Sequence, residues 1–303
     1  MSIGRFGLLM TNYTHDLAPG SLFGRIGDIA RAVDESAFDT LWLPDHLMQG
    51  PVGDLEANRG AAERTADGPA GRHTPMFDAP TLLGALALLT ARVRIGPLVS
   101  PVTTRHPALL AKAMTTVDVV SGGRAVVGLG AAWDADEHRR FGMAFPPARA
   151  RVDRLEDAVR ICRAMFDEPV VSLQGRQVSV DRAVNEPRPV SRRVPVLVGG
   201  TGARSLRIAA TYADACNPIG EADVLRGAFA AVDRCCATLG RDPAKVARLA
   251  GVMFHRTADV PGLVADAFAA GADGVILVPW QIALSPEWVS AIGAQLRAEF
   301  GDD

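Results

Sequence analysis

The feature that most constrains the fold is a repeated alternation of short apolar or β-branched runs with longer segments of helical periodicity. Such runs are typical of buried parallel strands, and the segments between them are typical of crossover helices. Eight runs can be counted, at 6–10, 40–43, 93–99, 125–129, 194–198, 213–217, 248–254 and 274–278. The clearest helix is expected at 151–166. The length of 303 residues exceeds that of two average domains and fits one barrel of roughly 250 residues with insertions equally well. The eight runs favour a (β/α)8 barrel.

Two segments depart from this alternation, and both follow predicted strands. Residues 49–74 are polar, rich in Gly, Ala and charge, and too long for an ordinary connection. We interpret them as an active-site lid, and an inert surface insertion is the alternative. Residues 168–193 contain a predicted hairpin with strands at 170–173 and 177–180, followed by a stretch punctuated by proline. We expect this insertion to pack beside the barrel, so that residues 1–303 form a single domain.

Composition and charge narrow the class of protein. The formal net charge is −2 and no cluster of Lys and Arg appears, which argues against a nucleic-acid surface. No window reaches the roughly 18 uninterrupted apolar residues of a membrane span, and the N-terminus lacks the apolar region of a signal peptide. We therefore expect a cytoplasmic protein that acts on a small-molecule substrate, with no nucleic-acid or membrane partner. A homodimer is left open.

The cysteines predict no metal or redox site. The chain has four cysteines without C-x-x-C spacing, and Cys162 lies on the apolar face of the helix expected at 151–166. Buried, reduced thiols are the expectation for all of them, namely Cys162, Cys216, Cys235 and Cys236.

An acidic and a titratable residue, Asp45 and His46, follow the apolar run at 40–43. In a parallel α/β fold, ligands bind at the carboxyl ends of the strands, so polar residues at this position are placed for chemistry. The imidazole of His46 can transfer protons near neutral pH at its ordinary pKa. The alternative is structural: Asp45 would cap the following segment and hydrogen-bond to His46.

A glycine-rich turn at 199–202 follows another predicted strand and precedes a helical pattern at 205–210. Glycines permit close backbone approach, and free N–H groups with the helix dipole favour a phosphate, to which Thr201 could add a hydroxyl donor. An ordinary strand-to-helix turn is the alternative. A second glycine-containing strand end, at 128–133, has Trp133 where the dinucleotide-binding fingerprint requires glycine. A Rossmann fold is therefore disfavoured.

These residues together resemble the luciferase-like monooxygenase superfamily, especially its branch of oxidoreductases that depend on the deazaflavin coenzyme F420. The resemblance spans nearly the whole chain and implies a (β/α)8 barrel with an insertion. The matching motifs are Leu41-Trp42-Leu43-Pro44-Asp45-His46, Val93-Arg94-Ile95-Gly96, residues 100–112, Ser121-Gly122-Gly123-Arg124, residues 128–133, Phe141-Gly142, Phe145-Pro146-Pro147, residues 151–156 and Gly199-Gly200.

The resemblance implies roles for particular residues. Asp45 and His46 match the catalytic pair beside the reactive ring of the cofactor, with His46 as the proton-transfer group. Leu98-Val99 matches the position of a non-prolyl cis peptide that bulges against the deazaflavin. The residues assigned to cofactor binding are Asp45, Leu98 and Val99, Gly130 and Ala131 at the edge of the ring, and Gly199, Gly200, Thr201 and Gly202 at the phosphate.

Several neighbouring residues need a separate interpretation. Family members that oxidise a sugar phosphate carry Glu where this chain has Ala131, which argues against that substrate class. Trp133 either lines the substrate pocket or packs structurally. His106 is expected at a helix start, in a structural role. The acidic and histidine residues of 134–138 diverge around a helix, so we expect a solvated face and no metal site.

The sequence therefore predicts an oxidoreductase that transfers a hydride between F420 and a small organic substrate, with His46 managing the proton. If FMN binds instead, the same barrel would support a monooxygenase that uses reduced flavin and oxygen. A barrel that only binds a ligand is the third class, in which Asp45 and His46 would be vestigial.

Overall fold

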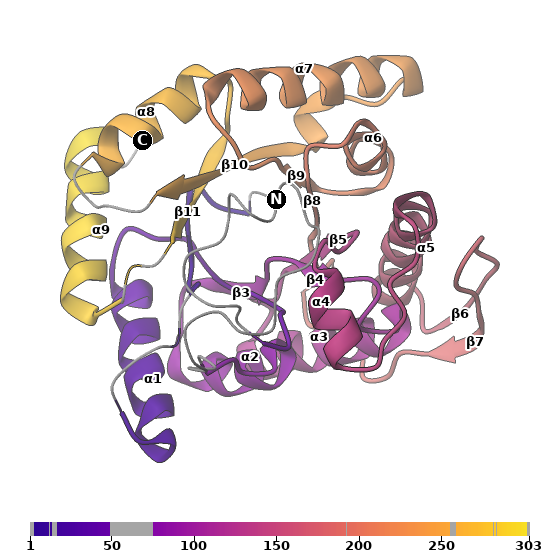
Figure 1. Ribbon diagram of the computed structural model, residues 1–303, viewed down its shortest axis with the longest axis horizontal. Helices are drawn as coiled ribbons and strands as arrows, with labels where there is room; N and C mark the ends of the chain where they lie inside the picture. Colours follow the sequence, from indigo (N-terminus) through magenta and orange to yellow (C-terminus); the bar gives the residue numbers. More distant parts are fainter. Residues whose placement is uncertain are drawn as a thin grey trace.

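The computed structural model describes residues 3–11, 13, 17–48, 75–191, 193–254, 259–280, 282 and 284–301. The segment 49–74, interpreted above as a lid, lies outside the described residues. In the described part, parallel strands form a barrel surrounded by helices (Figure 1). The predicted α/β class and (β/α)8 barrel are confirmed.

Nine parallel strands make up the barrel sheet of the described chain, in the order β3-β2-β1-β11-β10-β9-β8-β5-β4. The sheet closes because β3 also meets the start of the β5 segment: Ile95 forms a parallel bridge with Ala125. Because β4 continues the path of β3, the nine strands correspond to the eight predicted runs, with ends displaced by at most two residues. The strands are β1 (Phe6–Leu9), β2 (Thr40–Leu43), β3 (Arg94–Pro97), β4 (Ser100–Pro101), β5 (Val127–Gly130), β8 (Val196–Gly199), β9 (Ala215–Asn217), β10 (Ala247–Phe254) and β11 (Gly274–Pro279).

The helices follow the start and stop signals of the sequence. Asp78 and Ser285 cap α2 and α9 through their side chains, and left-handed glycines end α3 and α7 at Gly122 and Gly240. Helix α5 contains the amphipathic pattern predicted at 151–166. The helices are α1 (Pro19–Glu35), α2 (Ala79–Leu89), α3 (Pro107–Ser121), α4 (Ala135–Arg140), α5 (Ala148–Asp167), α6 (Ala203–Tyr212), α7 (Ala222–Leu239), α8 (Val260–Ala269) and α9 (Pro286–Phe300).

Two apolar clusters hold the barrel together. The larger cluster packs the strands against the helices. The smaller one takes alternate residues of the strands, including Leu9, Trp42, Leu197 and Ile276, and fills the barrel interior. The indole N–H of Trp42 is satisfied inside by the hydroxyl of Thr40 at 2.7 Å. The filled interior leaves the strand ends as the place where polar groups gather.

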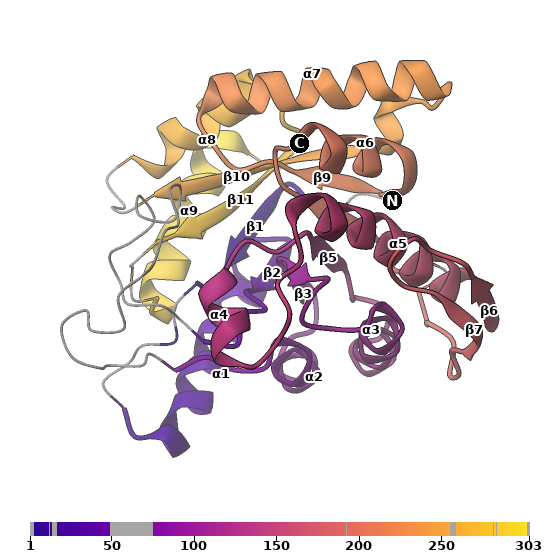
Figure 2. The ribbon, with the colours of Figure 1, turned by 45° about the vertical axis from the view of Figure 1, so that its right-hand side comes forward.

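The insertion contains an antiparallel hairpin of β6 (Val170–Leu173) and β7 (Val180–Val184), which lies beside α5 (Figure 2). The prediction of the second strand at 177–180 is wrong, since β7 begins only at Val180. The reason is that the backbone N–H groups of Gln177 and Val178 donate to the Asp157 carboxylate of α5, at 2.7 and 3.1 Å. These N–H groups are therefore engaged by α5 instead of the strand ladder.

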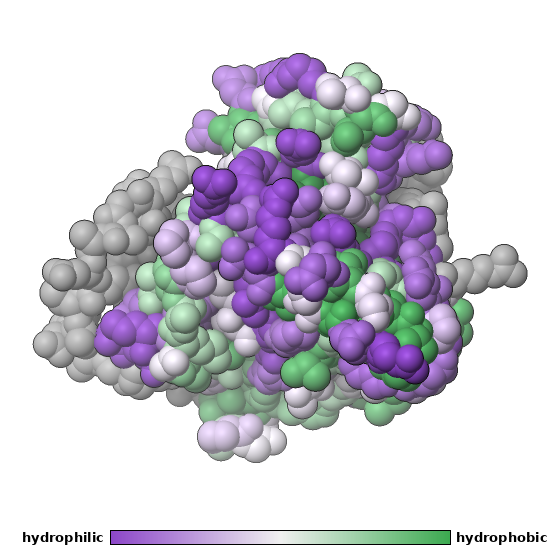
Figure 3. Space-filling model, turned by 90° about the vertical axis from the view of Figure 1, so that its right-hand side faces the viewer, coloured by the Kyte–Doolittle hydropathy of each residue, from purple (hydrophilic) through white to green (hydrophobic). Residues whose placement is uncertain are grey.

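The surface toward this hairpin shows hydrophilic residues over its centre and smaller groups of hydrophobic residues between them (Figure 3). No helix in the described part of the chain is long and apolar enough to cross a membrane. All four cysteines are free, and burial raises the pKa of the Cys162 thiol to about 12. Cys235 is half-buried, whereas the other three are buried as predicted.

Candidate active site

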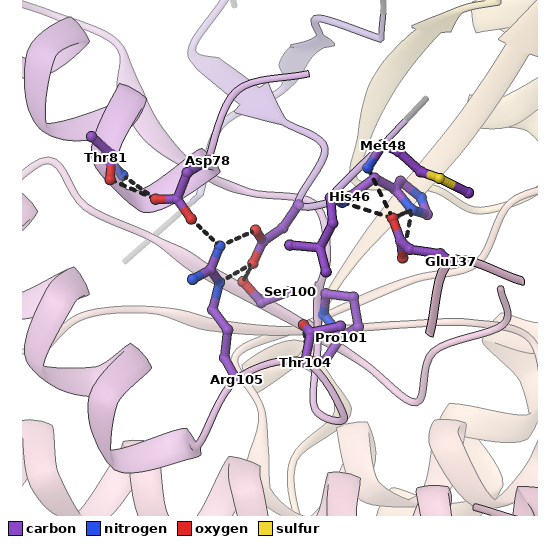
Figure 4. Close-up of polar contacts among 11 residues, drawn as sticks. His46, Met48, Asp78, Thr81, Ser100, Pro101, Thr104, Arg105 and Glu137 are labelled. Carbon is purple, nitrogen blue, oxygen red and sulfur yellow. Dashed lines mark hydrogen bonds and ion pairs between the residues drawn. The ribbon is translucent and has the colours of Figure 1, made fainter. Parts of the chain in front are cut away.

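The carboxyl end of β2 carries two separate polar networks, one on each side of the chain (Figure 4). Asp45 belongs to a network with Arg105 and Ser100, and His46 belongs to another with Glu137. The structural alternative considered above had His46 hydrogen-bonding to Asp45. In the structure each of the two side chains has its own partners, contributed by segments far away in the sequence.

Asp45 is held by a fixed cation. The guanidinium of Arg105 donates to both carboxylate oxygens of Asp45, each at 2.9 Å, and the hydroxyl of Ser100 donates at 2.6 Å. Asp45 is only 1% exposed, and such bidentate, charge-assisted bonds compensate for its burial. Arg105 also binds Asp78, the residue that caps α2. Arg105 thus joins the ends of β2 and β4 to the start of α2.

His46 is held by a buried carboxylate. Its Nδ1 lies 3.2 Å from Oε1 and 3.4 Å from Oε2 of Glu137, in the first turn of α4. The same Oε1 accepts the backbone N–H groups of Leu47 at 2.7 Å and Met48 at 3.3 Å. Asp134, the cap of α4, accepts the backbone N–H of Glu137 at 3.0 Å and so fixes the turn that presents the carboxylate.

The electrostatics of the pair favour an ionised carboxylate beside a protonated imidazole. Burial lowers the pKa of His46, but the hydrogen bond and charge of Glu137 outweigh it, with smaller contributions from Asp134 and Asp45, and the pKa is raised above 6.5. Burial raises the pKa of Glu137, but the bond and charge of His46 and the two backbone N–H groups bring it below its ordinary value. The two directions agree, since each partner stabilises the charged form of the other.

The expectation of a solvated face at 134–138 is wrong for two residues. Glu137 and His138 are both only 1% exposed, because their side chains bond to Leu47 after β2 and Thr103 after β4. His138 is satisfied by the carbonyl of Asp134 at 2.6 Å and the hydroxyl of Thr103 at 2.7 Å. In the described residues, no group of three or more His, Cys, Asp or Glu residues could hold a metal ion.

Trp133 and His106 are placed by the residues around them. The Trp133 ring packs edge-on against the His46 ring, with centroids 5.3 Å apart, and half of Trp133 is exposed. The preceding Ala132 has a left-handed backbone, which turns the chain from β5 toward His46. His106 caps α3 by accepting the backbone N–H of Ala108, which confirms its predicted position at a helix start.

The peptide bond between Leu98 and Val99 is cis, as the resemblance implies. The Val99 side chain fills the space that a Cβ would need at two of the predicted site glycines: it lies 2.4 Å from an ideal Cβ on Gly130 and 2.9 Å from one on Gly199. These glycines are thus required by the packing of Val99 between β5 and β8. The carbonyl of Ala131 accepts a bond from Arg151 at 3.1 Å.

The turn between β8 and α6 is exposed and open. Gly200 has a φ of +116°, and a Cβ built there or on Gly202 meets no atom closer than 3.9 Å. Gly202 stands at the cap position of α6, a helix of ten residues. Because glycine has no side chain, the cap residue does not accept the first N–H groups of this helix. Thr201 is exposed beside them. This arrangement can bind an anion through backbone N–H groups and the helix dipole.

Three residues of the site were missed from sequence. Ser100 and Arg105 lie in the matching motif at 100–112, and Glu137 lies at the third position of the helix that follows β5. Ser100 follows β3 and Arg105 follows β4, and this position after a strand could have identified both as candidates. No local signal pairs Glu137 with His46, since the contact spans 91 residues.

Known proteins share this architecture. An F420-dependent secondary alcohol dehydrogenase in complex with an F420-acetone adduct superimposes with a TM-score of 0.77 at 16% identity, covering 99% of both chains. A monooxygenase from Streptomyces bottropensis superimposes with a TM-score of 0.73 at 18% identity, covering 97% of this chain and 98% of the other. At such identities the likeness shows the fold alone.

Sequence relatives add oxidoreductases. An uncharacterized protein of Mycobacterium tuberculosis (strain H37Rv) is 29% identical over 200 residues, 65% of each chain. An F420-dependent glucose-6-phosphate dehydrogenase of Kineococcus radiotolerans is 30% identical over 180 residues, 59% of this chain and 47% of the relative. The chain therefore spans about half to two thirds of the length of these relatives. A phthiodiolone/phenolphthiodiolone dimycocerosates ketoreductase of Mycobacterium bovis is 29% identical over 268 residues, 84% and 67% of the two chains.

A family model covers most of the chain. Residues 5–277 match the model described as luciferase-like monooxygenase, a range that runs from β1 into β11 and includes all the polar residues of the candidate site described above. The chain belongs to the luciferase-like monooxygenase family.

Proposed function

We propose that the chain is an F420-dependent oxidoreductase, built as a single barrel domain, in which His46 moves the proton that accompanies hydride transfer to or from a small organic substrate. The observation that carries this proposal is the His46–Glu137 pair at the carboxyl end of β2. It places a titratable imidazole, held by a buried carboxylate, at the end of the barrel where ligands bind in this fold.

The residues at the strand ends fit the cofactor. The turn at Gly199, Gly200, Thr201 and Gly202 offers open space, a glycine backbone and the N-terminus of α6, which suits a phosphate. Leu98, Val99, Gly130 and Ala131 would lie against the ring, and Asp45 would lie near its edge. When bound, a deazaflavin supplies two-electron hydride chemistry at carbon.

The chain's own residues handle the proton and its surroundings. His46 would exchange a proton with the substrate through Nε2, for which the described residues provide no hydrogen-bond partner. Asp45 would keep the end of β2 in place through Arg105 and Ser100, and its Oδ1, which accepts one bond from Arg105, retains capacity for a cofactor N–H. Trp133 would form an apolar wall beside His46.

The same site could serve FMN instead, since the structural neighbours include a monooxygenase from Streptomyces bottropensis and a riboflavin lyase with modified FMN. The function would then be a monooxygenase that uses reduced flavin and oxygen. The F420-dependent relatives favour the deazaflavin, since three dehydrogenases with that cofactor in their names match at 29–31% identity.

Cofactor titration tests the proposal. F420, FMN and NADPH are each added to the purified protein while intrinsic tryptophan fluorescence is followed, and Trp133 beside His46 is a suitable reporter. We expect F420 to bind in preference to FMN, and the nicotinamide to bind weakly. Tight FMN binding with no response to F420 would overturn the F420 proposal, and the spectrum and mass of any copurified cofactor provide an independent measurement.

A further inference from the structure

Glu137 is a buried carboxylate whose side-chain bonds to the described residues converge on the segment after β2. It contacts Nδ1 of His46 and accepts the N–H groups of Leu47 and Met48. Its side chain is 1% exposed, whereas that of His46 is 27% exposed. The carboxylate is therefore on the inner side of the imidazole, and the imidazole is the member of the pair that reaches the accessible side.

We propose that Glu137 is the positioning residue of this site: it accepts the Nδ1–H of His46 and thereby directs Nε2 toward the substrate. The proposal rests on the function proposed above, in which His46 moves the proton. Glu137 touches neither substrate nor cofactor and acts only through the imidazole.

The geometry explains why this carboxylate can fix the ring. An ionised carboxylate only accepts hydrogen bonds, so Nδ1 must carry the proton in the neutral imidazole and Nε2 is then the free nitrogen. The two backbone N–H groups hold Oε1 in place independently of His46. The Trp133 ring, packed edge-on against the imidazole, restricts its rotation from another side. The tautomer and the orientation are thus set by groups outside the reacting atoms.

The proton inventory is simple. In the charged imidazole, the proton on Nδ1 stays on the ring and donates to Glu137, while the proton on Nε2 can pass to a substrate oxygen. The Nε2–H bond breaks with its electron pair left on Nε2, and an O–H bond forms. Glu137 remains ionised throughout, which compensates for the positive charge before transfer and preserves the Nδ1–H tautomer after it. In the opposite direction the same neutral tautomer accepts a proton at Nε2.

The carboxylate does not come from the strand end nearest in sequence to Trp133. Ala131 stands at the end of β5, so no acidic side chain reaches His46 from that strand. The carboxylate comes instead from α4, six residues further along the chain, where Asp134 caps the helix and the backbone turns at Ala132.

Three variants at one position separate charge, bonding and packing. Glu137→Gln keeps an acceptor for Leu47 and Met48 but removes the charge. Glu137→Asp keeps the charge on a shorter side chain, and Glu137→Ala removes both. Asp136→Asn is the matched control, because Asp136 lies on the same helix and pairs with Arg139 and Arg140 rather than with His46.

The primary readout is titration of the His46 ring by NMR in the protein without cofactor, with the His46→Gln spectrum assigning the signal. Among the described residues, Asp45, Asp134 and Glu137 are the charged groups that act on this ring, and removing the charge of Glu137 lowers the pKa of His46. We expect this lowering in Glu137→Gln, a smaller one in Glu137→Asp, and none in Asp136→Asn. The nitrogen shifts should show the Nδ1–H tautomer in the parent and a mixture in Glu137→Gln.

The second readout is the pH dependence of kcat. The limb that reports protonated His46 should move to lower pH in Glu137→Gln, while KM changes little and Glu137→Asp restores part of the profile. An unmoved His46 titration and tautomer in Glu137→Gln, in a protein that is folded, would overturn the positioning role. The NMR result does not depend on a cofactor, so a failure of F420 to bind would reject the proposed function while leaving the Glu137 test intact.

The stability of the pair has its own pH window. The raised pKa of His46 contributes stability below its ordinary value of 6.5 that is lost as pH rises through the folded-state pKa. The lowered pKa of Glu137 contributes stability above its ordinary value of 4.5 that is lost as pH falls through the folded-state pKa. The difference in melting temperature between parent and Glu137→Gln should therefore be largest between these limits and shrink on both sides. A difference independent of pH would contradict the ion pair.

Discussion

The segments that follow the carboxyl ends of β2 and β8, called here the β2 and β8 exits, are built in two different ways. After β2, each polar side chain has defined partners: Asp45 has Arg105 and Ser100, and His46 has Glu137. After β8, the turn at 199–202 contains glycines and one exposed threonine, and it offers backbone N–H groups at the start of α6. The first exit depends on side chains, and the second depends on the backbone.

The difference follows from what each exit would bind. Proton transfer needs one atom at a defined place with a tuned pKa, which only a side chain fixed by partners can provide. A phosphate spreads its charge over several oxygens, and several N–H groups with a helix dipole match it without a dedicated cation. Substitutions after β2 should therefore affect turnover or stability, and substitutions after β8 should affect cofactor affinity.

The largest effect is expected at His46. His46→Ala should lower turnover by roughly 10² to 10⁴, the usual contribution of a positioned general acid or base, while cofactor affinity changes much less. His46→Gln should be similarly slow, because an amide can hydrogen-bond to Glu137 but cannot carry the proton. Turnover, cofactor affinity and melting temperature are measured for both variants. A fully active Gln variant would assign His46 a structural role only.

Substitution of Asp45 should instead lower the free energy of unfolding. Asp45→Asn leaves the guanidinium of Arg105, whose side chain is 23% exposed, without its bidentate partner. Removing one member of a buried pair costs about 2 to 5 kcal/mol, toward the lower end here because Arg105 also binds Asp78. Urea denaturation of Asp45→Asn, Arg105→Gln and the double variant measures this cost. The double variant should be less destabilised than the sum of the single ones, and strict additivity would contradict the coupling.

The fold was predictable because strand and helix periods are local properties. Each apolar run follows from its own few residues, and the barrel follows from the number and alternation of the runs. The second hairpin strand was misplaced because a tertiary contact decided it: Asp157 of α5 takes the N–H groups of residues 177–178.

The site was predictable only in part, for the same reason. Asp45 and His46 could be located at a strand end, but their partners Arg105 and Glu137 lie 60 and 91 residues away in the sequence. Glu137 was expected on a solvated face because a helical pattern alone does not say which face of a six-residue helix is covered. Pairing between strand ends requires the closed barrel.

The smallest effect is expected after β8, where the backbone conformation differs between two glycines of the turn. Gly200 has a φ of +116°, so any side chain there would strain the turn. Gly202 has an ordinary φ of −67° and caps α6 without a side-chain bond. Gly202→Asp should therefore stabilise the helix by a few tenths of a kcal/mol or leave it unchanged, since Asp is a stronger cap than Gly.

The same carboxylate would lie where the phosphate is proposed to bind. We expect Gly202→Asp to weaken cofactor binding by more than about ten-fold through repulsion and through occupation of the first N–H groups of α6. Gly202→Asn is the matched control, because Asn caps as well as Asp and occupies the same N–H groups without charge. Fluorescence titration and thermal melting of both variants test the contrast between the two exits. The affinity for the cofactor should fall further in Gly202→Asp than in Gly202→Asn, and the melting temperature should fall in neither variant. Equal affinities in parent and Gly202→Asp would place the phosphate away from this turn, and the β8 exit would then be an ordinary connection.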